Sequence, residues 1–147
     1  MQRKIFRICI ILVLALSLNV SILAESMAPY SSSYFASYDA SAVVSAFRTF
    51  RVWFDVLAKS GMDELGASSI IIQQSSDQVN WTDVKTCLPA SYPQMIEENT
   101  VGVCNYITIT GIPGYYYRAY VTFYAKNSTG TGEICDYSEV VWLTNQP

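Results

Sequence analysis

The sequence contains no histidine, and this absence excludes several kinds of chemistry. Ser-His-Asp and Cys-His catalytic arrangements both use an imidazole as the base, so neither is available to this chain. Zinc sites of the common Cys/His type are not expected either, and none of the four cysteines belongs to a CxxC pair. We therefore expect no metal, no cofactor and no histidine-dependent catalysis.

Positive charge is also scarce. Nine basic residues stand against twelve acidic ones, and three of the basic residues fall within the first seven positions. Removal of residues 1–24 leaves six basic residues and a net charge of −6. The six are Arg48, Arg51, Lys59, Lys85, Arg118 and Lys126. A scattered, outnumbered set of this kind does not attract phosphate backbones or anionic lipid, so we expect no nucleic-acid partner.

Long hydrophobic runs are missing except at the start of the chain. Three basic residues precede an apolar run from Ile8 to Leu18, and Ala24 offers a small residue for cleavage. The run is shorter than the ~20 residues that a membrane span needs. We interpret residues 1–24 as a signal peptide, so we expect a secreted protein with no membrane span in the mature form. The remaining 123 residues suit one domain.

Alternation of inward and outward residues predicts strands in most of this remainder. A period of two is typical of a sheet with one buried face. The expected strands are 47–58, 68–75, 81–88, 101–110, 115–125 and 134–143. The two clearest inner rows are Phe50, Val52 and Phe54, and Ala119, Val121 and Phe123. The pattern indicates an all-β, antiparallel domain.

Segments without this alternation are assigned to other structure. We interpret residues 25–38 as a flexible lead-in or a short edge segment, and residues 39–147 as the domain. Ala40–Ala46 and Met62–Leu65 each suggest a single turn, helical in the first case. Pro89–Asn99 is expected to be a loop.

Three stretches resemble fibronectin type III-like domains. The segments IIIQQSSDQVNWTDV, GYYYRAYVTFYAKNSTG and YSEVV are similar to their C, C′, F and G strands, within Phe47–Leu143. The resemblance implies an antiparallel two-sheet sandwich, fibronectin III- or immunoglobulin-like, of about seven strands. It implies that Tyr115 or Tyr117 is a corner tyrosine and that Trp81 is the turn tryptophan. Trp53 matches the family's second-strand tryptophan only loosely.

A second resemblance concerns the segment MDELGASS, from Met62 to Ser69. It is similar to a segment of small secreted proteins of Gram-positive, clostridial-type bacteria that have no assigned activity. Both resemblances imply fold and location, and neither implies a chemistry, because sandwiches of this kind host many functions.

The sandwich expectation also suggests how the cysteines pair. Cys87 ends one strand before the long loop and Cys104 starts the next, and by alternation both lie on faces away from the core. We predict a Cys87–Cys104 disulfide, with Cys104–Cys135 as the alternative. The leftover thiol is expected to be inert or intermolecular.

The aromatic residues carry the one signal for recognition. Tyr116, Arg118, Tyr120 and Tyr124 share one face of the predicted strand 115–125. Exposed tyrosines can stack on sugars or anchor protein partners. The alternative interpretation is that these tyrosines form a cross-strand ladder that only covers the face of the sheet. We expect a non-catalytic, secreted interaction module whose partner is an extracellular protein or a glycan. A carbohydrate-binding module and, as a further alternative, a small carbohydrate-active hydrolase remain open.

Acidic side chains give weaker signals. A hydrolase would need two carboxylates facing each other in a cleft. Most of the acidic residues fall in turns or at outward strand positions, which is typical of solvated surface. Asp77 and Asn80 suggest calcium, but their spacing lacks the density of a calcium loop, so a plain turn is preferred.

Overall fold

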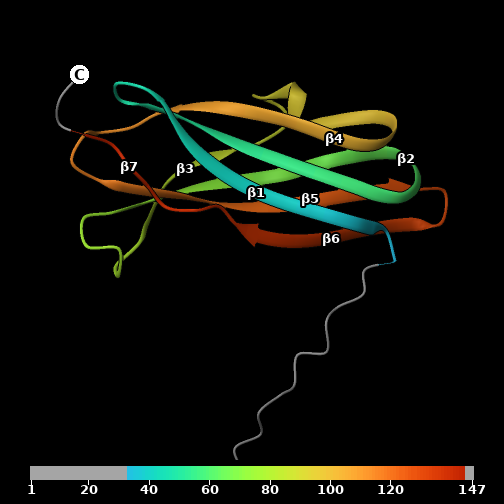
Figure 1. Ribbon diagram of the computed structural model, residues 1–147. Helices are drawn as coiled ribbons and strands as arrows, with labels where there is room; N and C mark the ends of the chain where they lie inside the picture. Colours follow the sequence, from blue (N-terminus) through green and yellow to red (C-terminus); the bar gives the residue numbers. More distant parts are fainter. Residues whose placement is uncertain (1–32, 145–147) are drawn as a thin grey trace, which may run out of the picture. The chain divides into compact units, whose positions relative to one another are not determined.

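Strand β2 (Thr49–Ser75) is the longest element and connects most of the others. The computed structural model describes residues 33–144 (Figure 1). The first half of β2 lies between β1 and β4, and its second half pairs with β5 and β3. Figure 1 shows the two halves of β2 running in opposite directions, so the strand curls the sheet back over itself.

The seven strands form one antiparallel sheet. They are β1 (Phe35–Ala46), β2, β3 (Thr82–Cys87), β4 (Ile96–Thr110), β5 (Tyr116–Asn127), β6 (Gly130–Tyr137) and β7 (Val141–Trp142). The one helical element in the described range is the short 3-10 turn η1 (Pro93–Met95). The all-β class and the antiparallel pairing are therefore confirmed. The strands belong to a single curled sheet, whereas the predicted sandwich has two.

The core lies on the inner face of this curl. Both predicted inner rows are confirmed, because Phe50, Val52, Phe54, Ala119, Val121 and Phe123 are all completely buried. Burial of each large apolar side chain stabilises the fold by about 1.5–3 kcal/mol. Other large side chains that are fully buried come from β2, β4, η1 and the C-terminal segment. They are Leu65, Ile70, Ile72, Met95, Ile107, Ile109 and Leu143.

Tyr117 makes the contact expected of a corner tyrosine. Its hydroxyl accepts a hydrogen bond from the backbone N–H of Ile112 at 2.7 Å and donates to the carbonyl of the same residue at 3.3 Å. Its ring packs against Phe50, with centroids 5.2 Å apart. Burial raises the pKa of the Tyr117 phenol. Of the two tyrosines proposed for this role, Tyr117 makes the hydrogen bonds to nearby backbone, and the family role itself stays a prediction.

Several predicted segment boundaries are wrong. Ala40–Ala46 is part of strand β1 and not a helical turn. β1 lies at the edge of the sheet and begins at Phe35, so the end of segment 25–38 agrees with the edge-segment reading, whereas the boundary at residue 39 lies inside the strand. Met62–Leu65 continues strand β2, with the polar Lys59–Gly61 lying at the curl. Between Leu57 and Met62 the register with β4 shifts, so four residues of β2 oppose one of β4. Local polarity therefore marked a bend in a strand, not its end.

Two further boundaries differ near the C-terminal half. The expected loop Pro89–Asn99 contains η1 and the first four residues of β4, which starts at Ile96. The expected closing strand, 134–143, is divided into β6 and β7, separated by residues 138–140. Residues 1–24, the predicted signal peptide, lie outside the described residues. Across residues 33–144, none of the helices has the length and apolar character to cross a membrane.

Candidate functional site

The four residues predicted to bind a ligand lie on strand β5. Tyr116, Arg118, Tyr120 and Tyr124 alternate with buried residues, so their side chains share the outward face of the sheet. Each is half-buried and not fully exposed. The shared face is confirmed, and the binding of a ligand stays a prediction.

Two aromatic pairs cross from β5 to its neighbours. Tyr116 lies against Trp142 of β7 with ring centroids 4.5 Å apart. Tyr120 lies against Tyr137 of β6 with centroids 4.7 Å apart. Such pairs contribute about 0.5–1.5 kcal/mol beyond the area they bury, which holds the rings in place. Trp142 and Tyr137 are still 40% and 47% exposed, so both pairs offer surface to a partner.

Arg118 connects the Tyr120–Tyr137 pair to Trp81. Its guanidinium lies 4.2 Å from the centroid of Trp81 and 4.5 Å from that of Tyr137, and its Nε donates to Gln73 at 2.8 Å. Trp81 is in turn fixed by its indole N–H, which donates to the carbonyl of Gln78 at 3.1 Å. We call this set the aromatic strip. Its members are Trp81, Tyr116, Arg118, Tyr120, Tyr137 and Trp142.

The turn before Trp81 is built around Asp77. The Asp77 carboxylate accepts hydrogen bonds from the backbone N–H of Asn80 at 2.8 Å, from the Asn80 side chain at 2.7 Å and from the N–H of Val79 at 2.9 Å. These bonds, that of the Asn80 backbone first, lower the pKa of Asp77 well below its usual range. The plain turn is confirmed. Among residues 33–144, no three acidic or cysteine side chains are grouped so as to hold a metal ion.

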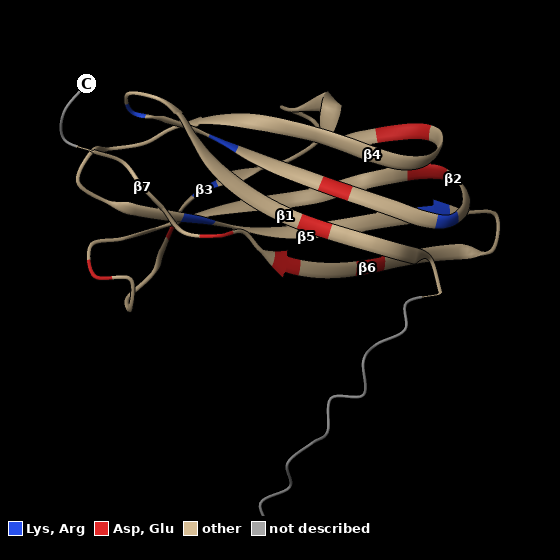
Figure 2. Ribbon diagram, in the orientation of Figure 1, with Lys and Arg blue, Asp and Glu red and all other residues tan. Residues whose placement is uncertain are grey.

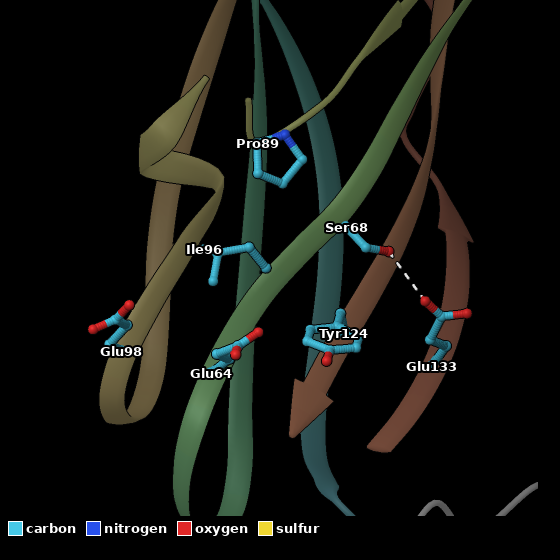
Figure 3. Close-up of a pocket in the computed structure, with 7 residues that line it drawn as sticks. All are labelled: Glu64, Ser68, Pro89, Ile96, Glu98, Tyr124 and Glu133. Carbon is cyan, nitrogen blue, oxygen red and sulfur yellow. Dashed lines mark hydrogen bonds between the residues drawn. The ribbon is translucent and has the colours of Figure 1, made fainter. Parts of the chain in front are cut away.

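A pocket of about 350 Å³ opens near the other end of β5 (Figure 3). Tyr124, on the same face as the strip, lines it. Its remaining apolar lining is Pro89 and Ile96, and its polar lining is Ser68, Glu64, Glu98 and Glu133. Glu64 belongs to β2, Glu98 to β4 and Glu133 to β6. In Figure 3, Glu64 and Glu98 lie on one side of Tyr124 and Glu133 lies on the other, where it accepts a hydrogen bond from Ser68 at 3.3 Å. The volume is at the lower end of the range of ligand sites.

The charges of this pocket are unbalanced. Glu64 of β2 lies directly opposite Glu98 of β4 in the sheet register. Lys126 of β5 bonds to Glu64 at 2.6 Å, and this hydrogen bond raises the pKa of the lysine. Neither Glu98 nor Glu133 has an ion pair in the part of the chain that the structure describes. Figure 2 shows acidic segments of β2 and β4 lying together at the end where both strands curl.

No protein-family model and no curated protein matches the chain. The arguments about function below therefore rest on the site itself.

The predicted disulfide is not formed, and the three cysteines in the described range are free thiols. Cys87 is completely buried, and burial raises the pKa of its thiol. The expectation placed it on a face away from the core, but β3 has a register shift: Ile72 pairs with Lys85 and Gln73 with Asp83. This bulge reverses the alternation, so Cys87 lies opposite the buried Ile70 and points inward.

The other two cysteines lie on outward faces. Cys104 is opposite Asp55 on the first half of β2, and partial desolvation, followed by the Asp55 charge, raises the pKa of its thiol. Cys135 is opposite Thr122 of β5, whose hydroxyl lies 3.7 Å from its Sγ. Cys87 in the core and Cys104 on an outer face are on opposite sides of the sheet, which prevents the predicted bond.

Sequence reasoning missed the partners that complete the site. Tyr137 and Trp142 were read as parts of one closing strand, without their ring contacts. The alternation of outward residues in β6 is a signal that places Glu133 and Tyr137 on one face, whereas their position beside β5 follows only from the pairing of the two strands. Another aromatic cluster, separate from the aromatic strip, was not predicted from the sequence and lies on the outer face of β2 and β4. There Trp53 lies 4.6 Å from Tyr106, and the guanidinium of Arg51 lies 4.5 Å from the same ring.

Proposed function

We propose that this protein is a secreted, non-catalytic interaction module that binds an extracellular partner through the aromatic strip. In this proposal the curled sheet is a variant of the fibronectin III- or immunoglobulin-like architecture, with its curl providing both layers. The partner is a protein. The arrangement of half-exposed rings around a fixed arginine carries the proposal.

The physical chemistry of the strip favours recognition. Tyrosine, tryptophan and arginine are the residues that most often dominate binding energy at protein interfaces. Arg118 is held by two rings and by Gln73, so little side-chain freedom is lost when a partner covers it. Four of the five rings lie on strands, and Trp81, at the end of the turn before β3, is held by its hydrogen bond to Gln78, which also reduces the cost of ordering the surface.

The test compares strip variants with a matched aromatic variant elsewhere. We would select ligands for the purified protein from a displayed random-peptide library and screen a glycan array in parallel. Tyr116→Ala and Tyr120→Ala are expected to weaken peptide binding at least about tenfold, as removal of central aromatic contacts does. Tyr106→Ala removes the same kind of stacked ring from the other outer face and is expected to leave binding unchanged.

A carbohydrate-binding module is the second candidate. The observation in its favour is that the tyrosines are spaced along one strand and end at a pocket with hydroxyl and carboxylate groups. Glycan binding that is lost in the strip variants would support this candidate over the first. Binding that survives in the strip variants, binding that is lost equally in Tyr106→Ala, or no ligand in either screen would contradict the role of the strip.

A further inference from the structure

The pocket beside Tyr124 has the features of a site for a positively charged group. Its two ends belong to different parts of the sheet: Glu98 is on β4, and Glu133 is on β6. Between them the sheet has Gly66, which lies opposite Ile96 on one side and Tyr124 on the other. At Gly66 the main chain of Met95 and Ile96 approaches β2 closely, since a Cβ there would meet the Met95 carbonyl oxygen.

The electrostatics of the pocket also favour a cation. Like charges directly opposite each other on neighbouring strands destabilise a sheet, and Glu64 and Glu98 are such a pair. Lys126 offsets the charge of Glu64 from the other side, but Glu98 and Glu133 have no basic partner within residues 33–144. A cation placed between the glutamates would relieve this repulsion, and the negative net charge of the chain would attract it.

The walls of the pocket indicate which cation fits. The three glutamates are not grouped closely enough to hold a metal ion. A guanidinium instead stacks flat on an aromatic ring while its N–H groups reach separate carboxylates, and its aliphatic stem packs on apolar side chains. Tyr124, the glutamates, and Ile96 with Pro89 supply these three kinds of contact. The same face already holds an arginine in this way, since Arg118 stacks on Trp81 and Tyr137.

We propose that this pocket binds an arginine side chain presented by the protein partner. The proposal rests on the proposed function, because the strip and the pocket share the outward face of β5. The strip then supplies aromatic contact area, and the pocket selects a partner that has a basic residue at the matching position. Lysine fits less well, because its ammonium is a compact, strongly hydrated charge that cannot stack on Tyr124.

A small probe tests the pocket without a known partner. N-acetyl-arginine methylamide would be titrated into the isotope-labelled protein and followed by amide chemical shifts. We expect saturable shifts at Ile96, Glu98, Tyr124 and Glu133. The citrulline analogue, which has the same shape without the charge, is expected to bind at least about fivefold more weakly, because charge-assisted hydrogen bonds are the stronger ones.

Matched variants locate the binding. Glu98→Gln and Glu133→Gln are each expected to weaken binding of the arginine probe about fivefold, as loss of a charge-assisted bond does. Glu97→Gln removes the same charge from the neighbouring position, which does not line the pocket, and is expected to change binding by less than about twofold.

The results separate this proposal from the proposed function. Tyr116→Ala and Tyr120→Ala are expected to leave binding of the arginine probe unchanged, so failure of the strip does not affect this assay. Equal binding of arginine and citrulline probes would overturn the proposal. Shifts remote from the pocket, or pocket shifts with a neutral hexasaccharide but not with arginine, would overturn it as well.

Discussion

Asp77 shows how a single side chain positions part of the aromatic strip. Its carboxylate accepts bonds from Val79 and Asn80 and thereby fixes the turn that leads to Trp81. Local bonds of this type are the reason that aspartate and asparagine favour turns. Trp81 then stacks on Arg118, so the geometry of the strip depends on a carboxylate that does not belong to it.

The lowered pKa of Asp77 predicts how stability depends on pH. Because its pKa is lower in the folded chain than the ordinary value of 3.8, the ionised carboxylate stabilises the fold above that value. This contribution is lost as the pH falls below it. Asp77→Asn keeps the shape of the side chain but not its charge. The variant is therefore expected to be less stable than the unsubstituted protein, and the difference in free energy of unfolding between the two is expected to shrink as the pH falls from about 5 to about 2.5. Urea unfolding at the two pH values measures it. A deficit that stays constant would contradict the prediction.

At the level of elements, Gly66 lies at the junction of three strands, β2, β4 and β5, and the packing of these strands depends on this one residue. It has a φ of 148°, a conformation that L side chains rarely adopt. A Cβ at this position would collide with the carbonyl oxygen of Met95, just before β4. The absence of a side chain therefore lets η1 and β4 approach β2.

Gly66→Ala is expected to destabilise the fold by about 3 kcal/mol or more, since it combines backbone strain with overpacking against a main-chain atom. Gly61→Ala is the matched control on the same strand, because a Cβ there would meet nothing within 4 Å. It is expected to change the free energy of unfolding by less than about 0.5 kcal/mol. Denaturant unfolding of both variants measures the difference. Equal effects would mean that the close approach at Gly66 is not required.

The elements that were predicted correctly are those with strong alternation. The rows around Val52 and Val121 place apolar inner residues in strict alternation with outer residues that carry a polar group, so their faces follow from the sequence. Strand β1 was missed because its central residues are small and offer little contrast between faces. The inward position of Cys87 depends on the bulge in β3, which only the pairing with β2 determines.

The site was predictable in part for the same reason. The face shared by Tyr116, Arg118 and Tyr120 follows from alternation within one strand. Their partners Tyr137 and Trp142 become neighbours only through strand pairing. The hairpin that joins β5 to β6 sets the register of Tyr137, and the pairing of the separate short strand β7 with β5 sets that of Trp142. The pocket needs the pairing of β2 with both β4 and β5, and no local pattern encodes that contact.

At the scale of the whole described domain, one curled sheet has an inner face that forms the core and outer faces that carry the aromatic clusters. Phe54 and Trp53 are adjacent in β2 and lie on opposite faces of the sheet. Phe54 is completely buried, whereas Trp53 is half-buried on the outer face, where it contacts Tyr106. Because the curl encloses Phe54 and leaves Trp53 on the outside, the stability of the fold is expected to depend on Phe54 more than on Trp53.

Truncation of these neighbours tests that assignment. Phe54→Ala is expected to cost about 3–5 kcal/mol of unfolding free energy, because it leaves a cavity in the core. Trp53→Ala removes a larger side chain, but this side chain is only half-buried and its removal leaves no enclosed cavity, so the variant is expected to lose clearly less unfolding free energy than Phe54→Ala. Equilibrium unfolding in urea gives both values. If Trp53→Ala proves as costly as Phe54→Ala, the outer face is itself buried, and the strip on the other outer face would then need to be reconsidered as a structural ladder and not a binding surface.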